Sequence, residues 1–122
     1  MPISINYDRE KNVIHTRAEG EIKFHDIMNY FSSVSELDLK KGYCVLGDYD
    51  EASLELSTKD MDNMAMLRNE MIDEDDKINI AVFSKQDLTF GLGRIYEAFL
   101  DSKKYKVMIF RTEAEAKAWL GI

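Results

Sequence analysis

The chain has 122 residues, which is enough for one domain and too few for two of ordinary size. Hydrophobic residues make up 45% and charged residues 32%, and no apolar run approaches the length of a membrane-spanning helix, so we expect neither a disordered chain nor a transmembrane protein. Because 23 acidic side chains outnumber 16 basic ones, the net charge is −7, which disfavours nucleic acid as a partner. We expect a single domain over residues 1–122.

The compartment is inferred from the cysteine content and from the first residues. Cys44 is the only cysteine, so it cannot form an internal disulfide. Residues 1–4 lack the basic and apolar regions of a signal peptide. Both features predict a cytoplasmic protein.

A hairpin, a helix and a strand are predicted in the first part of the chain. Alternating apolar residues predict strands over residues 3–7 and 13–19, joined by a polar turn. The apolar period then changes and predicts a helix over residues 25–37. Residues 43–46 are apolar and β-favouring, and residues 47–50 favour a turn, so we expect a short buried strand there.

Helices and strands alternate in the rest of the chain. Ser57 has the pattern of a helix N-cap and opens a second helix that should end near Ile72. Strands are predicted over residues 78–83 and 105–110, and a capping box at residues 112–115 opens the last helix. The apolar stripe of the second helix is Met64, Leu67 and Met71, with Met61 and Ile72 beside it. The stripe of the third helix is Leu88, Leu92, Ile95 and Phe99.

The element order is therefore ββαβαβαβα, and it predicts an α/β fold with a mixed sheet flanked by helices. Strands that are separated by helices favour parallel pairing through right-handed crossovers. Binding sites in such sheets tend to lie beyond the carboxyl ends of the parallel strands. Two glycines, Gly91 and Gly93, weaken the start of the third helix and predict a mobile lid there.

Two segments carry a family resemblance: FGLGRIYE at residues 90–97 and VMIFRTEAEAKAWL at residues 107–120. Together with the element order, they resemble small bacterial proteins of the SpoIIAA-like group, which are related in fold to STAS domains. The resemblance implies a SpoIIAA-like fold and a regulatory or ligand-binding module, with no catalytic activity common to the family. Phosphorylatable STAS proteins carry an acceptor serine after the central strand. The hydroxyls in that region here are Ser53, Ser57 and Thr58, without the Asp-Ser-Ser-Gly motif.

Catalytic and metal-binding signatures are missing from the sequence. His15 and His25 lie on different predicted elements without metal-ligand spacing, and Cys44 lies in an apolar strand that disfavours its thiolate form. The acidic cluster of Asp48, Asp50 and Glu51 is either a solvated turn or a site for a hard cation such as Mg²⁺. We predict a protein that is not an enzyme, with no catalytic residues, no metal and no cofactor.

A ligand site is predicted from apolar residues that the helical stripes do not explain. Met66 and Phe90 lie roughly opposite the stripes of the second and third helices, so both could rim a shared cleft, with Leu92 and Tyr96 beside it. Ordinary core packing explains the same residues. The leading prediction is a non-enzymatic module that binds a small apolar or amphipathic ligand, or a protein partner, through these two helices.

The alternative prediction is a phosphorylation-linked interaction regulator of the STAS type, acting through the hydroxyls at residues 53, 57 and 58. A homodimer is compatible with spare apolar helix surface. Contact with a membrane surface is a secondary expectation, because the net charge opposes adsorption and only the lysines at residues 103, 104 and 106 offset it.

Overall fold

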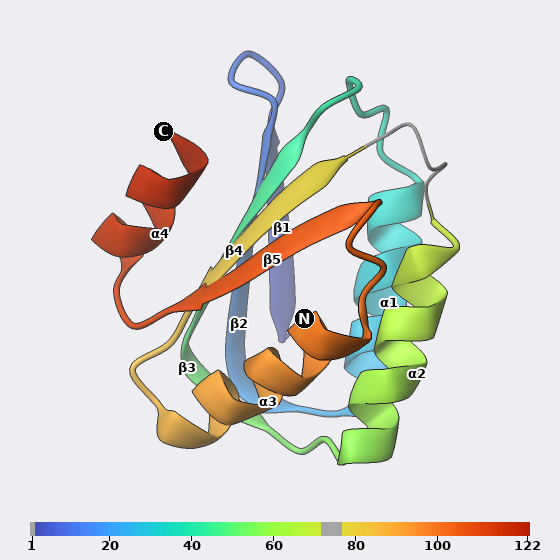
Figure 1. Ribbon diagram of the computed structural model, residues 1–122, viewed down its shortest axis with the longest axis vertical. Coiled ribbons are helices and arrows are strands. Elements are labelled where there is room, and N and C mark those ends of the chain that lie inside the picture. Colours follow the sequence, from blue (N-terminus) through green and yellow to red (C-terminus); the bar gives the residue numbers. More distant parts are fainter. Residues whose placement is uncertain (1, 72–76) are drawn as a thin grey trace.

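A mixed sheet forms the centre of the protein, in a computed structural model that describes residues 2–71 and 77–122. The strand order is β1-β2-β3-β4-β5 (Figure 1). β1 is antiparallel to β2, and the pairs β2–β3, β3–β4 and β4–β5 are parallel. The strands are β1 (Ile3–Asp8), β2 (Val13–Ile22), β3 (Cys44–Leu54), β4 (Ile78–Phe83) and β5 (Tyr105–Phe110).

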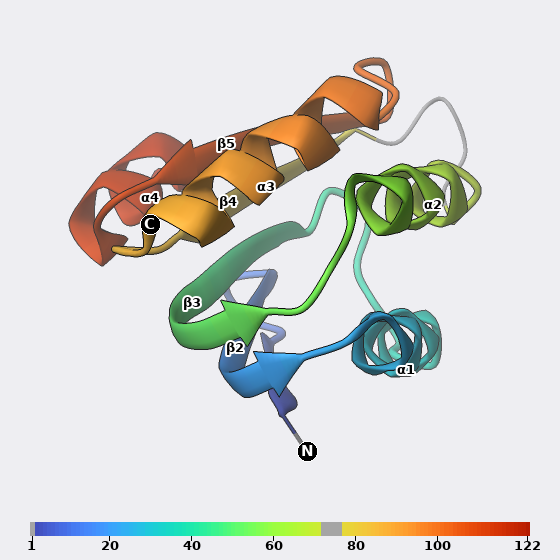
Figure 2. The ribbon, with the colours of Figure 1, turned by 90° about the horizontal axis from the view of Figure 1, so that it is seen from below.

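Helices cover both faces of this sheet. Each parallel connection leads to the next strand in the same direction, so right-handed crossovers place α1, α2 and α3 on one face (Figure 2). α4 follows the last strand and packs on the opposite face. The helices are α1 (Phe24–Ser35), α2 (Thr58–Asn69), α3 (Asp87–Phe99) and α4 (Glu113–Leu120). The predicted order and the α/β class are confirmed.

The core has two parts because successive strand residues point to opposite faces. Ile14 and Val45 belong to the larger apolar cluster under α1, α2 and α3. Val13 and Leu46 belong to the smaller cluster, which Ala116 of α4 covers. Within the described residues, no helix combines the length and the apolarity needed to cross a bilayer.

β3 is longer than the sequence predicts. The turn expected at residues 47–50 is strand instead, because β3 stays paired with β2 as far as Ile22 and Leu54. The register shifts between Arg17 and Glu19, which lets the long ladder bend without ending. The predicted acidic cluster therefore lies within a strand and not on a strand-to-helix loop.

The predicted inward faces of α2 and α3 are partly wrong. Leu67 and Leu88, which the sequence predicts on the apolar stripes of α2 and α3, are 41% and 64% exposed. α2 ends at Asn69, and the predicted end near Ile72 lies outside the described residues. The residues that are buried instead are Met61, Met64, Ala65 and Arg68 of α2, and Thr89 and Leu92 of α3. Tertiary packing, not apolarity alone, sets which face turns inward.

Candidate functional site

Two adjoining cavities lie between the sheet and helices α1, α2 and α3. Their volumes are about 50 Å³ and about 70 Å³. A space of roughly 10–15 Å³ already holds a water molecule, so each cavity admits several ligand atoms. The residues that line both cavities are Ile27, Tyr49, Met64, Val82 and Tyr96. Because they share these walls, we treat the cavities as one site.

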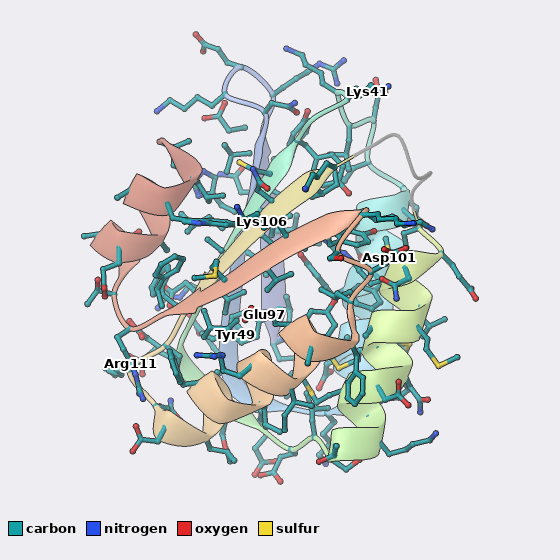
Figure 3. All side chains as sticks on the ribbon, viewed as in Figure 1. Lys41, Tyr49, Glu97, Asp101, Lys106 and Arg111 are labelled. Carbon is teal, nitrogen blue, oxygen red and sulfur yellow. The ribbon has the colours of Figure 1, made fainter. Side chains whose placement is uncertain are left out.

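Strand β3 shapes the floor of this site. Val45, Gly47 and Tyr49 alternate onto the same face, and all three line the first cavity. A Cβ atom on Gly47 would lie 3.1 Å from Cε1 of Tyr49 and 3.3 Å from Cγ2 of Val82. Glycine therefore leaves room for the Tyr49 ring, which lies in the middle of the molecule between the sheet and α3 (Figure 3).

Arg68 is the charged side chain of the site. It lines the first cavity and is only 2% exposed, because it follows Met61, Met64 and Ala65 on the inward face of α2. Its guanidinium carbon lies 5.3 Å from the ring centroid of Phe31. The same carbon lies 5.4 Å from the ring centroid of Tyr105, whose hydroxyl donates a hydrogen bond of 2.7 Å to the carbonyl oxygen of Arg68.

Among the described residues, no carboxylate forms an ion pair with the guanidinium group of Arg68. The ion pairs found among the described residues join other side chains, and Nε of Arg68 is buried without a hydrogen-bond partner. Burial acts to lower the pKa of Arg68, but its interactions with Tyr96 and Tyr30 outweigh burial and raise that pKa. The site therefore carries a positive charge at neutral pH.

Tyrosine hydroxyls add polar atoms to the apolar walls. The hydroxyl oxygens of Tyr30 and Thr16 are 3.0 Å apart and share a buried hydrogen bond. Burial raises the pKa of both Tyr49 and Tyr96, so both stay protonated at neutral pH. Within the described part of the chain, neither of these two side chains makes a hydrogen bond. Their hydroxyls are therefore free to donate to a ligand.

The residues predicted as ligand contacts do not gather in one place. Tyr96 lines both cavities, whereas Leu92 is buried in the core and lines neither. Phe90 lies under the guanidinium of Arg111, whose carbon is 4.1 Å from the ring centroid. Met66 is 56% exposed on α2. Met66 and Phe90 line neither of the two cavities, and both their predicted shared cleft and ligand contact at Met66, Phe90 and Leu92 stay predictions.

The start of α3 is held in place on several sides. Asp87 accepts a hydrogen bond of 2.9 Å from Arg111, and Gln86 donates one of 2.7 Å to the carbonyl oxygen of Asp50. Gly93 packs closely on Ile109 of β5. Packing against Ile109 therefore explains why residue 93 is a glycine, without any need for a mobile lid.

The predicted phosphoacceptors lie outside the cavities. Ser57 caps α2: its hydroxyl accepts from the Asp60 amide at 3.0 Å, and the Asp60 carboxylate accepts from the Ser57 amide at 2.9 Å. Thr58 is exposed at the first residue of α2, and Ser53 is exposed on β3. A phosphate on Ser57 would meet the Asp60 carboxylate, and one on Ser53 would face Glu21, its partner across the β2–β3 pair.

The acidic cluster serves the connection between β4 and α3. The Asp50 carboxylate accepts from the Lys85 amide at 2.9 Å, and the Lys85 ammonium lies 3.5 Å from the Glu51 carboxylate. Asp48 accepts from the amide of Asp50. Among the residues described, no group of three or more His, Cys, Asp or Glu side chains is arranged to hold a metal ion.

Comparison with solved structures decides the fold. The chain is similar to the crystal structure of an uncharacterized protein of the DUF3478 family, with a SpoIIAA-like fold, from Shewanella loihica PV-4. The TM-score is 0.59, and the match covers 97% of this chain and 93% of that one. This chain has a SpoIIAA-like fold. At 16% identity the likeness to this SpoIIAA-like protein shows the fold alone. No protein-family model matches the chain, and no curated protein matches it in sequence.

Arg68, the charged residue of the two cavities, is not among the site residues predicted from the sequence. An apolar pattern does not indicate Arg68, because arginine is charged. The signal was present, since Met61, Met64, Ala65 and Arg68 follow the i, i+3, i+4, i+7 spacing of one helix face. A basic residue that completes an apolar helix face is therefore a signal for a buried charge.

Proposed function

We propose that the protein is a non-enzymatic cytoplasmic module that binds a small amphipathic ligand between the sheet and helices α1, α2 and α3. The observation that carries this proposal is the pair of joined cavities, whose shared walls are aliphatic side chains and tyrosines. Small-molecule sites are typically apolar with a few polar groups that fix the orientation of the ligand. α2 and α3 supply Met64 and Tyr96, in line with a role for the second and third helices.

The lining residues argue for binding without chemistry. Of the residues that the structure describes, no Asp, Glu, His, Cys or Lys lines either of these cavities. General acid–base catalysis needs a group that gains and loses a proton near neutral pH. Arg68 stays charged, and Tyr49 and Tyr96 stay neutral, so none of these groups fulfils that need.

Native mass spectrometry of freshly purified protein tests this proposal. We expect a retained small molecule at one per chain, released on denaturation. Val82 lines both cavities, so Val82→Phe should fill the space and reduce retention at least about tenfold. Met66→Phe enlarges an exposed side chain and should retain the molecule like the wild type. Retention by Val82→Phe equal to wild type would contradict the cavity as the site.

A second candidate function is a STAS-type interaction regulator. The SpoIIAA-like fold and the exposed hydroxyls of Ser53 and Thr58 favour it. Incubation with kinases of the source organism, followed by intact mass measurement, tests this candidate. Stoichiometric phosphate that disappears in Ser53→Ala or Thr58→Ala would support it. Protein that stays unmodified would leave ligand binding as the function, whether the chain acts alone, as a homodimer or with a protein partner.

A further inference from the structure

We propose that Arg68 is the anion-binding group of this site and that the ligand is a small apolar carboxylic acid. The carboxylate accepts hydrogen bonds from the guanidinium, and the hydrocarbon part fills the second cavity. This inference rests on the proposed function and adds the chemical class of the ligand.

The first argument is that Nε of Arg68 is buried without a hydrogen-bond acceptor. A buried cation without a counter-ion is costly, and proteins normally pair it or keep it in water. The rings of Phe31 and Tyr105 attract the charge, but a ring face does not accept the hydrogen bond that Nε offers. A ligand oxygen next to Nε would supply both the missing acceptor and the missing negative charge.

The second argument is the polarity gradient across the two cavities. Arg68, Tyr30 and Thr16 line the first cavity only. Leu54, Leu56, Met61 and Ile109 line the second cavity only. Tyr49 and Tyr96 line both, so their hydroxyls are placed between the two ends. An acidic head in the first cavity and an apolar tail in the second match this order.

The third argument selects a carboxylate among the anions. A guanidinium presents a planar fork of donors that matches the two oxygens of a carboxylate. One positive charge balances one negative charge, whereas a phosphate dianion would bring a second charge into apolar surroundings without compensation. The small volumes of the cavities favour a short or compact acid.

Calorimetric titration with two matched probes tests the assignment. Hexanoate and hexan-1-ol have the same chain and differ in the charge of the head. We expect wild-type protein at neutral pH to bind hexanoate at least about tenfold more tightly than hexan-1-ol, as for a buried charged hydrogen bond. Arg68→Met should bind hexan-1-ol like the wild type and lose the preference for hexanoate. Arg68→Lys keeps the charge but loses the fork, and should keep only part of the preference.

A matched control and a third probe complete the experiment. Arg94→Met makes the same substitution at an exposed arginine of α3 and should keep the full preference. Equal binding of both probes by the wild type would overturn the role of Arg68 and leave the cavity as a binding site. Binding of neither probe would contradict the proposed function itself. Tighter binding of hexyl phosphate than of hexanoate would overturn the carboxylate assignment. These wild-type results do not depend on whether a variant folds.

Discussion

A Cβ atom on Gly93 would lie 2.8 Å from Cδ1 of Ile109, so α3 approaches β5 more closely than any larger residue allows. Ile109 is buried and β-branched, which limits how far it can move. Gly91, two residues earlier, has open space around its Cβ position. The two glycines of the third helix therefore have different roles, and only one of them is required by packing.

Alanine at these two positions should have opposite effects on stability. Gly93→Ala should lower the free energy of unfolding by about 1–3 kcal/mol, because the added methyl group crowds Ile109. Gly91→Ala should raise it by about 0.5–1 kcal/mol, because alanine favours an exposed helix position. Urea denaturation measures both values. A stabilising Gly93→Ala would show that α3 moves away from β5 without cost.

Arg68 is predicted to reduce stability in exchange for binding. Arg68→Met removes a buried unpaired charge, and it also removes the ring contacts with Phe31 and Tyr105. We expect a free energy of unfolding equal to the wild type or up to about 2 kcal/mol higher. Thermal denaturation with and without hexanoate provides the check: the acid should raise the Tm of the wild type and not that of Arg68→Met. If the variant were destabilised by more than about 2 kcal/mol, Arg68 would instead stabilise the fold.

Stability should fall in alkaline solution because of a buried tyrosine. Burial raises the pKa of Tyr105 to about 12, whereas an unfolded tyrosine titrates near 10. The folded state therefore holds the proton more tightly, and the contribution is complete below pH 10 and is lost as the pH rises towards 12. The loss should be about 2 kcal/mol. Tyr105→Phe, followed by urea denaturation at several pH values, should show a shallower decline than the wild type. An unchanged slope would contradict the raised pKa.

Phe90 is predicted to affect stability and not ligand uptake. Its ring lies under Arg111 and packs against the larger core cluster, away from the cavity walls. Phe90→Ala should lower the free energy of unfolding by about 1–3 kcal/mol, because it loses the cation–π contact and part of the apolar packing. Binding of hexan-1-ol under folding conditions should stay within about twofold of the wild type. Loss of binding in a folded Phe90→Ala variant would contradict this prediction and support the cleft predicted from the sequence.

The fold was accessible from the sequence because local signals agree with each other. The strand over residues 78–83 and the helix N-caps Ser57 and Thr112 are read from patterns of a few residues, and each appears in the structure as predicted. The capping box predicted at residues 112–115 is only half formed, because the Glu115 carboxylate accepts from the hydroxyl of Thr112 and not from its amide. The long β3 was missed because Gly47 and Asp50 favour turns locally, while pairing with β2 is a contact between distant residues. Pairing of that kind leaves no local signal.

The site was less accessible, since it depends on which face of each helix turns inward. Leu67 and Arg68 are adjacent on α2, and the apolar pattern favours Leu67 as the inward residue although Arg68 is the one that is buried. On α3, the inward residues Thr89 and Gly93 are polar or small, so an apolar pattern gives no indication of them. Packing of helices on a sheet decides these faces, and one sequence does not contain that information in a local form.

Methyl NMR of the methionines tests the central claim most directly. The chain has methionines inside and outside the site: Met61 and Met64 line the cavities, whereas Met66 and Met108 are exposed on other surfaces. Titration of [¹³C-methyl]methionine protein with hexanoate should shift the Met61 and Met64 signals in a saturable manner and leave those of Met66 and Met108 unchanged. Shifts confined to Met66, or none at Met61 and Met64 under saturating hexanoate, would contradict an internal site for a small apolar acid.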